Sequence, residues 1–269
     1  MPFLACYLFQ MLNSHKMIRF FAFFFLIAFV VGCSSKEQKE SVRVFAASSL
    51  AAPLVELKAL FERQTGTSVK LNFASSGLLA QQIAKGVPAD LFLSANQKWA
   101  SFLSSKNQNW QVQDRALVTN ELVFACRDST QQKVWNVGEE YPFSKTKLAM
   151  GDPATVPLGQ YGKKMLKEMN WWKISQKNLL FTKDAASALK LLKEGHVECA
   201  LVYQSQVKQE ASLYAIGAVE QRLQPKVGYF LQNLSGKRIA EELQAFLNSS
   251  EAQKVFADFG FSRPIPDEL

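Results

Sequence analysis

Strand-like and helix-like segments alternate along this chain, and that alternation restricts the possible fold more than any other feature. Residues 42–47 (VRVFAA) read as a strand, and Leu50, Leu54, Leu57 and Phe61 then recur at helical spacing. The same order of strand and helix returns several times further along the chain. Strands separated by helices of this length are typical of parallel βαβ units. The sequence therefore predicts an α/β protein.

The later segments divide into two series of this kind. The first continues with a strand at 69–74, a helix at 78–85 and a buried strand at 90–94. The second contains KLAMGD, LLFTKD and CALVY as strands, with helices predicted at 157–169 and 185–194.

We expect two doubly wound lobes joined by two hinge crossings, near 120–125 and 226–231. Lobe 1 takes 42–122 plus 228–269, including two C-terminal helices, and lobe 2 takes 123–227. A cleft between such lobes is a common place for a small ligand.

The N-terminus carries an export signal. An uncharged apolar run, FFAFFFLIAFVVG, follows Arg19 and is shorter than the ~20 residues that span a bilayer. Its proportions predict a signal peptide over 1–32, with Met17 as an alternative start. The string VVGC resembles the lipobox of bacterial lipoproteins, which implies acylation of Cys33; an ordinary signal cleaved nearby is the alternative. Residues 33–41 read as a polar tether, so the protein is expected to be periplasmic or at the cell surface, on a lipid anchor.

Charge and cysteine content narrow the possibilities further. The chain has 31 Lys and Arg against 23 Asp and Glu, but the basic residues are scattered, so we expect no nucleic-acid partner. Cys126 and Cys199 each lie inside a strand-like run. An exported protein could oxidise such a pair, yet buried free thiols are the expected state.

Four segments share one design, in which a strand ends, small residues follow and a helix begins. They lie at 46–50 (AASSL), 73–77 (FASSG), 156–159 (VPLG) and 182–186 (TKDAA). A helix N-terminus leaves N–H groups free and carries a positive partial charge. In doubly wound sheets these ends line the ligand crevice, so several of them together predict an anion site.

None of the four turns places an arginine at its helix start, and this restricts the choice of anion. A site made of neutral donors holds a dianion through hydrogen bonds and gives an anion's own hydroxyl no acceptor. We therefore expect molybdate, tungstate or sulfate rather than phosphate, and neither a cofactor nor a directly bound metal.

At these same segments the sequence resembles the periplasmic molybdate-binding proteins of ABC importers. The matching strings are VFAASSL (44–50), FASSGLLAQQIAKGVPADLFLSANQKW (73–99), GDPATVPLGQYGKKML (151–166) and LVYQS (201–205). The resemblance implies a type II periplasmic-binding-protein fold that closes on a tetrahedral oxyanion. It also implies an ABC permease and its ATPase as partners, and a monomer.

The resemblance also implies a set of ligand-binding residues. By position these are Ser49 and Ser76 through hydroxyl and N–H, Leu158 and Ala185 through their N–H groups, and Tyr203 through its phenol.

Two departures from the family pattern fall in the second lobe. Many relatives continue after the tyrosine with Ser-Asp-Ala where this chain has SQV at 205–207. The string KDAASAL at 183–189 also matches the fourth turn loosely.

Other functions have less support in the sequence. An enzyme is not expected, because after Cys33 the chain has a single histidine, His196, in a turn. A receptor of the same fold for another oxyanion, such as sulfate or thiosulfate, is the alternative, together with a surface lipoprotein that takes no part in transport.

Overall fold

The structure is a computed structural model that describes residues 41–110, 112–127 and 133–264. The predicted signal peptide, the proposed lipidation site at Cys33 and the tether up to residue 40 lie outside the described residues. Within the described ranges, no helix has both the length and the apolar character to cross a membrane.

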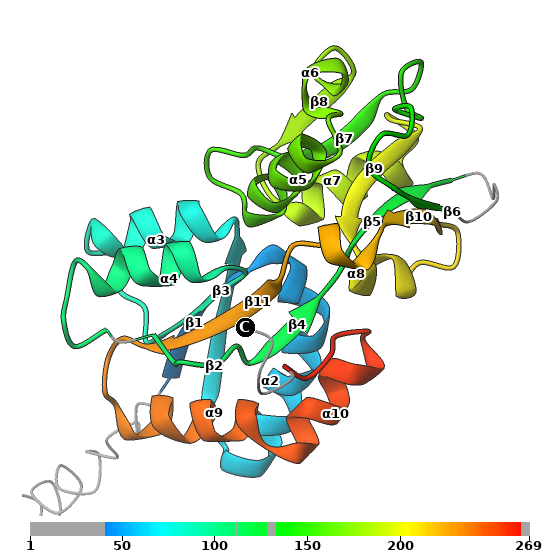
Figure 1. The fold of residues 1–269 in the computed structure, drawn as a ribbon. Helices are drawn as coiled ribbons and strands as arrows, with labels where there is room; N and C mark the ends of the chain where they lie inside the picture. Colours follow the sequence, from blue (N-terminus) through cyan, green and yellow to red (C-terminus); the bar gives the residue numbers. More distant parts are fainter. Residues whose placement is uncertain (1–40, 111, 128–132, 265–269) are drawn as a thin grey trace, which may run out of the picture. The chain divides into compact units, whose positions relative to one another are not determined.

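The first of two sheets has the strand order β2-β1-β3-β11-β4. Its strands are β1 (Ser41–Ala47), β2 (Ser68–Ala74), β3 (Leu91–Ser94), β4 (Val118–Asn120) and β11 (Val227–Asn233). β1 pairs in parallel with β2 and β3, as the βαβ pattern predicts, and β11 runs antiparallel to both of its neighbours. We call this sheet and its helices the first lobe (Figure 1).

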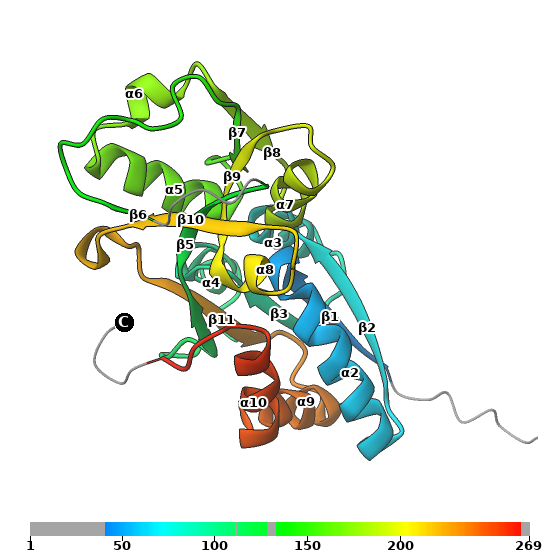
Figure 2. The ribbon, with the colours of Figure 1, turned by 90° about the vertical axis from the view of Figure 1, so that its right-hand side faces the viewer.

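Helices cover both faces of the first sheet. They are α2 (Ala51–Thr65), α3 (Ser76–Ala84), α4 (Gln97–Ser104), α9 (Arg238–Asn248) and α10 (Ser250–Asp258), and the short 3₁₀ turn η1 (Ser48–Leu50) precedes α2. α2, α9 and α10 pack together on one side (Figure 2), and α3 and α4 pack together on the other. The two C-terminal helices, α9 and α10, thus lie with α2 beside the first sheet.

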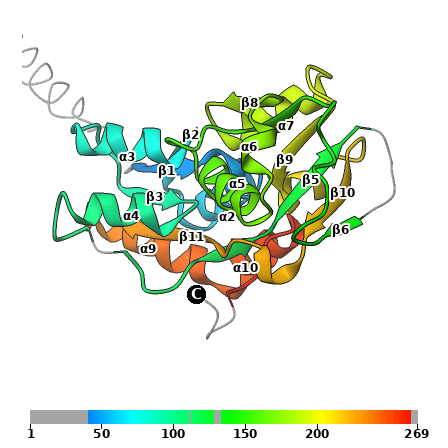
Figure 3. The same cartoon turned by 45° about the horizontal axis from the view of Figure 1, so that its top comes forward.

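The second sheet has the strand order β6-β10-β5-β9-β7-β8. Its strands are β5 (Leu122–Cys126), β6 (Lys133–Trp135), β7 (Leu148–Gly151), β8 (Leu179–Thr182), β9 (Cys199–Tyr203) and β10 (Tyr214–Val219). Its helices are α5 (Pro157–Glu168), α6 (Trp172–Ser175), α7 (Ala185–Lys193) and α8 (Gln204–Lys208). α5 and α7 both pack on β7. We call this part the second lobe (Figure 3).

Local sequence explains where these elements begin and end. α2 ends at Gly66, whose φ of 71° is a left-handed conformation that glycine adopts without steric cost. α5 begins with Pro157 at its first position, where the missing N–H is not needed. Gly159 then lets α5 approach β7, because a Cβ there would lie 2.0 Å from the carbonyl oxygen of Gly151.

The chain passes between the sheets twice. β4 belongs to the first sheet and β5 to the second, with Glu121 alone between them. The return lies in 220–226, which contains η2 (Gln221–Leu223), and leads into β11. This sheet membership supports the lobe boundaries predicted from the sequence, which we retain as a proposal.

The expectation of two free thiols is wrong. Cys126 and Cys199 form a disulfide. The two residues are directly opposite each other in the antiparallel pair β5–β9, with 4.2 Å between their Cα atoms. Opposed residues in such a pair come this close because of the backbone pairing alone. The sequence shows both strands but not their register, and the register decides the pairing.

Candidate functional site

The five predicted site residues lie around one small cavity. The cavity has a volume of about 10 Å³ and is lined by twelve residues of both lobes: Ala47, Ser48, Ser49, Ala74, Ser75, Ser76, Ala95, Val156, Pro157, Leu158, Ala185 and Tyr203. All five predicted residues are therefore brought together. None of the twelve carries a charge.

The start of α3 leaves one N–H group free to face the cavity. Ser75 caps the helix and accepts the Leu78 N–H at 3.3 Å, and the Gly77 N–H donates to the Thr155 carbonyl oxygen at 3.1 Å. The first turn of a helix has no internal acceptor for its N–H groups. The N–H of Ser76, the first residue of α3, remains for a ligand.

The helices of the second lobe follow the same arrangement. At the start of α7, Asp184 accepts the Ser187 N–H at 2.7 Å, and Ser48 Oγ accepts the Ala186 N–H at 3.3 Å. This leaves the N–H of Ala185. In α5 the first residue is a proline, so Leu158 carries the first N–H of that helix.

The hydroxyl groups around the cavity have different partners. Ser76 Oγ accepts the Ala95 N–H at 3.0 Å, so the Ser76 proton is free to donate elsewhere. Ser49 Oγ lies 2.8 Å from the hydroxyl of Tyr229. The Tyr203 hydroxyl is buried, and no group in the described part of the chain bonds to it. A buried polar group without a partner is costly, and this hydroxyl belongs to a residue that lines the cavity.

The electrostatics favour neutral phenols at this site. Burial raises the pKa of Tyr203 well above its ordinary value, and nearby Tyr229 and Tyr161 raise it further. The phenol therefore keeps its proton at any physiological pH and can donate it. A carboxylate or a thiolate in this place would instead repel an anion.

Direct hydrogen bonds join the two lobes beside the cavity. Besides the bonds of Gly77 to Thr155 and of Ala186 to Ser48, the Asn96 side chain donates to Gln160 Oε1 at 2.8 Å. The cavity that they close has room for about one water molecule. Because a tetrahedral oxyanion is larger, we expect the lobes to lie slightly further apart around a bound anion.

Two further observations concern side chains that could bind a metal ion or carry a negative charge. Among the described residues, no group of three or more His, Cys, Asp and Glu side chains is placed to hold a metal ion. The two aspartates within the matching strings bond to the protein itself: Asp90 accepts the Arg43 N–H at 2.8 Å and pairs with Lys237, and Asp152 accepts the Ala154 N–H at 2.9 Å.

With this geometry in place, comparison with known proteins gives the family. Residues 42–262 match the family described as bacterial extracellular solute-binding proteins. The chain belongs to this family. Solute-binding proteins of this kind are exported and are not a class of enzymes.

Several characterised proteins are similar to this solute-binding protein. The molybdate-binding protein of Haemophilus influenzae is 30% identical over 82% of this chain and 89% of its own length. That of Escherichia coli K12 is 28% identical over 88% of this chain and 94% of its own. The periplasmic molybdate-binding protein of Azotobacter vinelandii superposes with a TM-score of 0.69 at 19% identity, covering 83% of this chain and all of the other. This last likeness confirms the type II periplasmic-binding-protein fold.

The sequence did not point to three residues that support the site from behind. Tyr229 and Asn120 contact each other and connect to Ser49. Gln206 accepts the Tyr203 N–H at 3.2 Å and donates to the Ala185 carbonyl oxygen at 3.1 Å. Gln206 falls in the segment that departs from the family pattern, so that departure was a signal for it. Tyr229 and Asn120 lie in strands and had no such signal.

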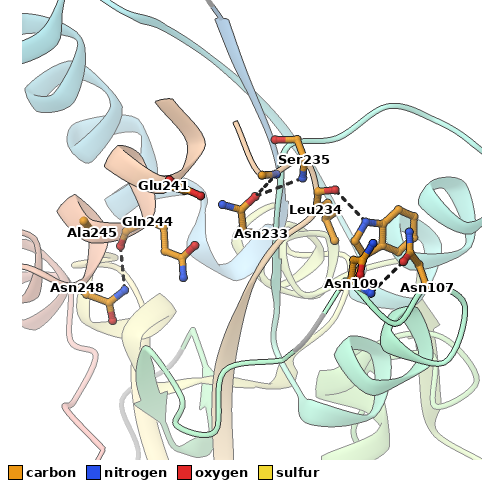
Figure 4. Close-up of a pocket in the computed structure, with 11 residues that line it drawn as sticks. Asn107, Asn109, Asn233, Leu234, Ser235, Glu241, Gln244, Ala245 and Asn248 are labelled. Atoms are coloured by element: carbon orange, nitrogen blue, oxygen red, sulfur yellow. Dashed lines mark hydrogen bonds between the residues drawn. The ribbon is translucent and has the colours of Figure 1, made fainter. Parts of the chain in front are cut away.

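A larger cavity of about 790 Å³ lies in the first lobe, away from this site (Figure 4). It lies between the loop after α4 and the segment that runs from Asn233 along α9 to Asn248. Its amides serve local turns: Asn107 Oδ1 accepts the Asn109 N–H, and Asn233 Oδ1 accepts the Ser235 and Gly236 N–H groups. These bonds explain Asn107 and Asn233 without a ligand.

Proposed function

We propose that this protein captures molybdate, and also tungstate, outside the cytoplasm for an ABC importer. One observation carries the proposal. Hydroxyl and N–H donors from both lobes surround a single cavity whose lining residues are all uncharged. Full-length relatives that are named as molybdate-binding proteins support the same ligand.

The ligand would be held by donors alone. We assign it three hydroxyls (Ser49, Ser76 and Tyr203) and four N–H groups (Ser49, Ser76, Leu158 and Ala185), which makes seven donors. Each hydrogen bond to a charged group is worth about 1.5–3 kcal/mol. Micromolar to nanomolar binding needs about 8–12 kcal/mol, so seven such bonds suffice even after association costs of several kcal/mol.

The same donors would discriminate against protonated anions. Molybdate, tungstate and sulfate have no proton to donate at neutral pH, whereas phosphate keeps one. A hydroxyl of the ligand that faces a donor would leave two donors opposed, at a cost of about 1–3 kcal/mol. Size must then separate molybdate from sulfate, whose bonds to oxygen are shorter.

The surroundings of the protein complete the proposal. We propose that acylation of Cys33 holds it at a membrane surface and that it acts as a monomer. Its partners would be a membrane permease and a cytoplasmic ATPase. These assignments rest on the lipobox-like string VVGC and on the family.

Calorimetry on the protein from Cys33 onward tests the ligand. We expect tight binding of molybdate and tungstate, sulfate binding weaker by about two orders of magnitude or more, and phosphate binding weaker still. Sulfate binding as strong as molybdate binding would contradict the proposal and indicate a sulfate receptor instead. Failure of all four anions to bind would refute the oxyanion site.

A further inference from the structure

A chain of buried hydrogen bonds runs behind the proposed ligand site. Ser49 Oγ lies 2.8 Å from the Tyr229 hydroxyl, Tyr229 interacts with the side chain of Asn120 on the neighbouring strand, and Asn120 Nδ2 donates to Ser205 Oγ at 2.7 Å. All four residues are buried. The chain connects a ligand-facing serine of the first lobe to the start of α8 in the second.

The orientation of the Asn120 amide determines which group donates and which accepts in this series of hydrogen bonds. Its Oδ1 accepts two backbone N–H groups, that of Glu121 at 3.0 Å and that of Ser205 at 3.3 Å. The other end of the amide is therefore the NH₂ group, which can only donate. Asn120 thus donates to Ser205 Oγ, and it offers the nearby hydroxyl of Tyr229 no acceptor.

The Tyr229 hydroxyl in turn determines which way the Ser49 hydroxyl points. The Asn120 NH₂ group cannot accept the single proton of Tyr229, which leaves Ser49 Oγ, 2.8 Å away, as the acceptor. Burial raises the pKa of Tyr229, and it does so strongly enough that the proton stays on the phenol. With its oxygen already accepting from Tyr229, Ser49 turns its own proton toward the cavity.

We propose that Asn120 and Tyr229 are positioning residues that fix Ser49 as a donor, and thereby make the site select fully deprotonated oxyanions over protonated ones. Ser76 is fixed as a donor more simply, by the backbone N–H of Ala95. The inference rests on the proposed function for its ligand, but its subject is the direction of one hydroxyl. A serine without such a partner can rotate and accept a proton from the ligand.

Two substitutions change which groups donate in these hydrogen bonds. Tyr229→Phe removes the donor to Ser49 and frees that hydroxyl to accept. Asn120→Asp replaces the NH₂ group by an acceptor, so that Tyr229 donates to the carboxylate and Ser49 must donate to Tyr229. Calorimetry at about pH 8, where inorganic phosphate still carries one proton, measures molybdate and phosphate binding for each variant. We expect the preference for molybdate over phosphate to fall about 10-fold or more in both.

The same substitution made in Ser49→Ala protein separates a positioning role of Tyr229 from a purely structural one. In Ser49→Ala protein there is no hydroxyl to orient, so adding Tyr229→Phe should leave the ratio of the two affinities unchanged. An equal drop with and without Ser49 would overturn the proposal, as would an unchanged ratio in both single variants. Thermal unfolding of each variant checks that it is folded.

The outcome also separates this inference from the proposed function. If the unsubstituted protein binds sulfate instead of molybdate, the proposed function fails, and the same variants are compared with sulfate and phosphate as probes, since the direction of Ser49 matters equally for any fully deprotonated dianion. If the unsubstituted protein prefers phosphate, or binds none of these anions, the inference is overturned together with the function.

Discussion

At the scale of single residues, Tyr203 and Tyr141 form a natural pair for comparison. Both have buried hydroxyls for which the described part of the chain offers no partner. Burial raises the pKa of Tyr141 to about 12 and that of Tyr203 well above the ordinary value, so both phenols stay neutral. They differ in place: Tyr203 lines the cavity, and Tyr141 packs among the aromatic rings of the second lobe.

The first prediction uses this difference. Tyr203→Phe removes a ligand donor and should weaken molybdate binding by about 1–3 kcal/mol, a factor of about 5 to 150, as measured by calorimetry. Tyr141→Phe removes an equally buried hydroxyl and should leave the affinity unchanged. Because neither hydroxyl bonds to any residue that the structure describes, thermal unfolding of both variants should show a stability equal to or above that of the parent. Equal affinities for the two variants would remove Tyr203 from the site.

At the scale of elements, the sequence predicted most of the strands and helices that build the site. Each of the four predicted turns leads into a helix: Ser75, Pro157 and Asp184 start three of them, and the first leads through η1 into α2 without a side-chain cap. The helix α4 was missed, and so were the short strand β4 and the partly exposed strand β10. β4 has three residues, too few to show a periodicity.

The residues that support the site could not be predicted from the sequence, for a different reason. Ser49 and Tyr229 are 180 positions apart, and their contact depends on how β11 lies beside β3 in the sheet. The Cys126–Cys199 pair depended in the same way on strand register. Local patterns therefore predicted the donors that the helices present but not the groups that hold those donors in place.

The second prediction concerns the disulfide between β5 and β9. It closes a loop of 73 residues, so its reduction should cost about 2–5 kcal/mol of the free energy of unfolding, by removing a restraint on the unfolded chain. Urea unfolding with and without dithiothreitol measures this cost. A variant with both cysteines replaced by alanine is the control, and dithiothreitol should not change its unfolding in urea. An equal shift by dithiothreitol in both proteins would rule out the disulfide as its source.

At the scale of the whole molecule, two lobes meet through a few polar contacts beside the cavity. The bond between Asn96 and Gln160 lies outside the ring of ligand donors, since neither residue lines the cavity. Asn96 also caps α4 by accepting the Trp99 N–H, which makes it a poor target for substitution. Gln160 is partly exposed, so its side chain can be removed without leaving a cavity in the core.

The third prediction follows from this contact. Gln160→Ala should weaken molybdate binding by about 0.5–1.5 kcal/mol, because the bond forms only when the lobes meet. Stopped-flow measurement should place the change in the dissociation rate rather than in the association rate. Lys164→Ala, on the exposed face of the same helix, is the matched control. A slower association with unchanged dissociation would contradict a role in closure.

The burial of the two bridged sulfurs has a consequence for how the cell makes this protein. Cys126 and Cys199 are only 6% and 7% exposed once their strands are paired, so an oxidising enzyme has little access to them in the finished sheet. The bridge must therefore form early, while the newly translocated polypeptide is still open. A batch that matures under reducing conditions would enclose its thiols, and adding an oxidant afterwards would recover little of the bridged form.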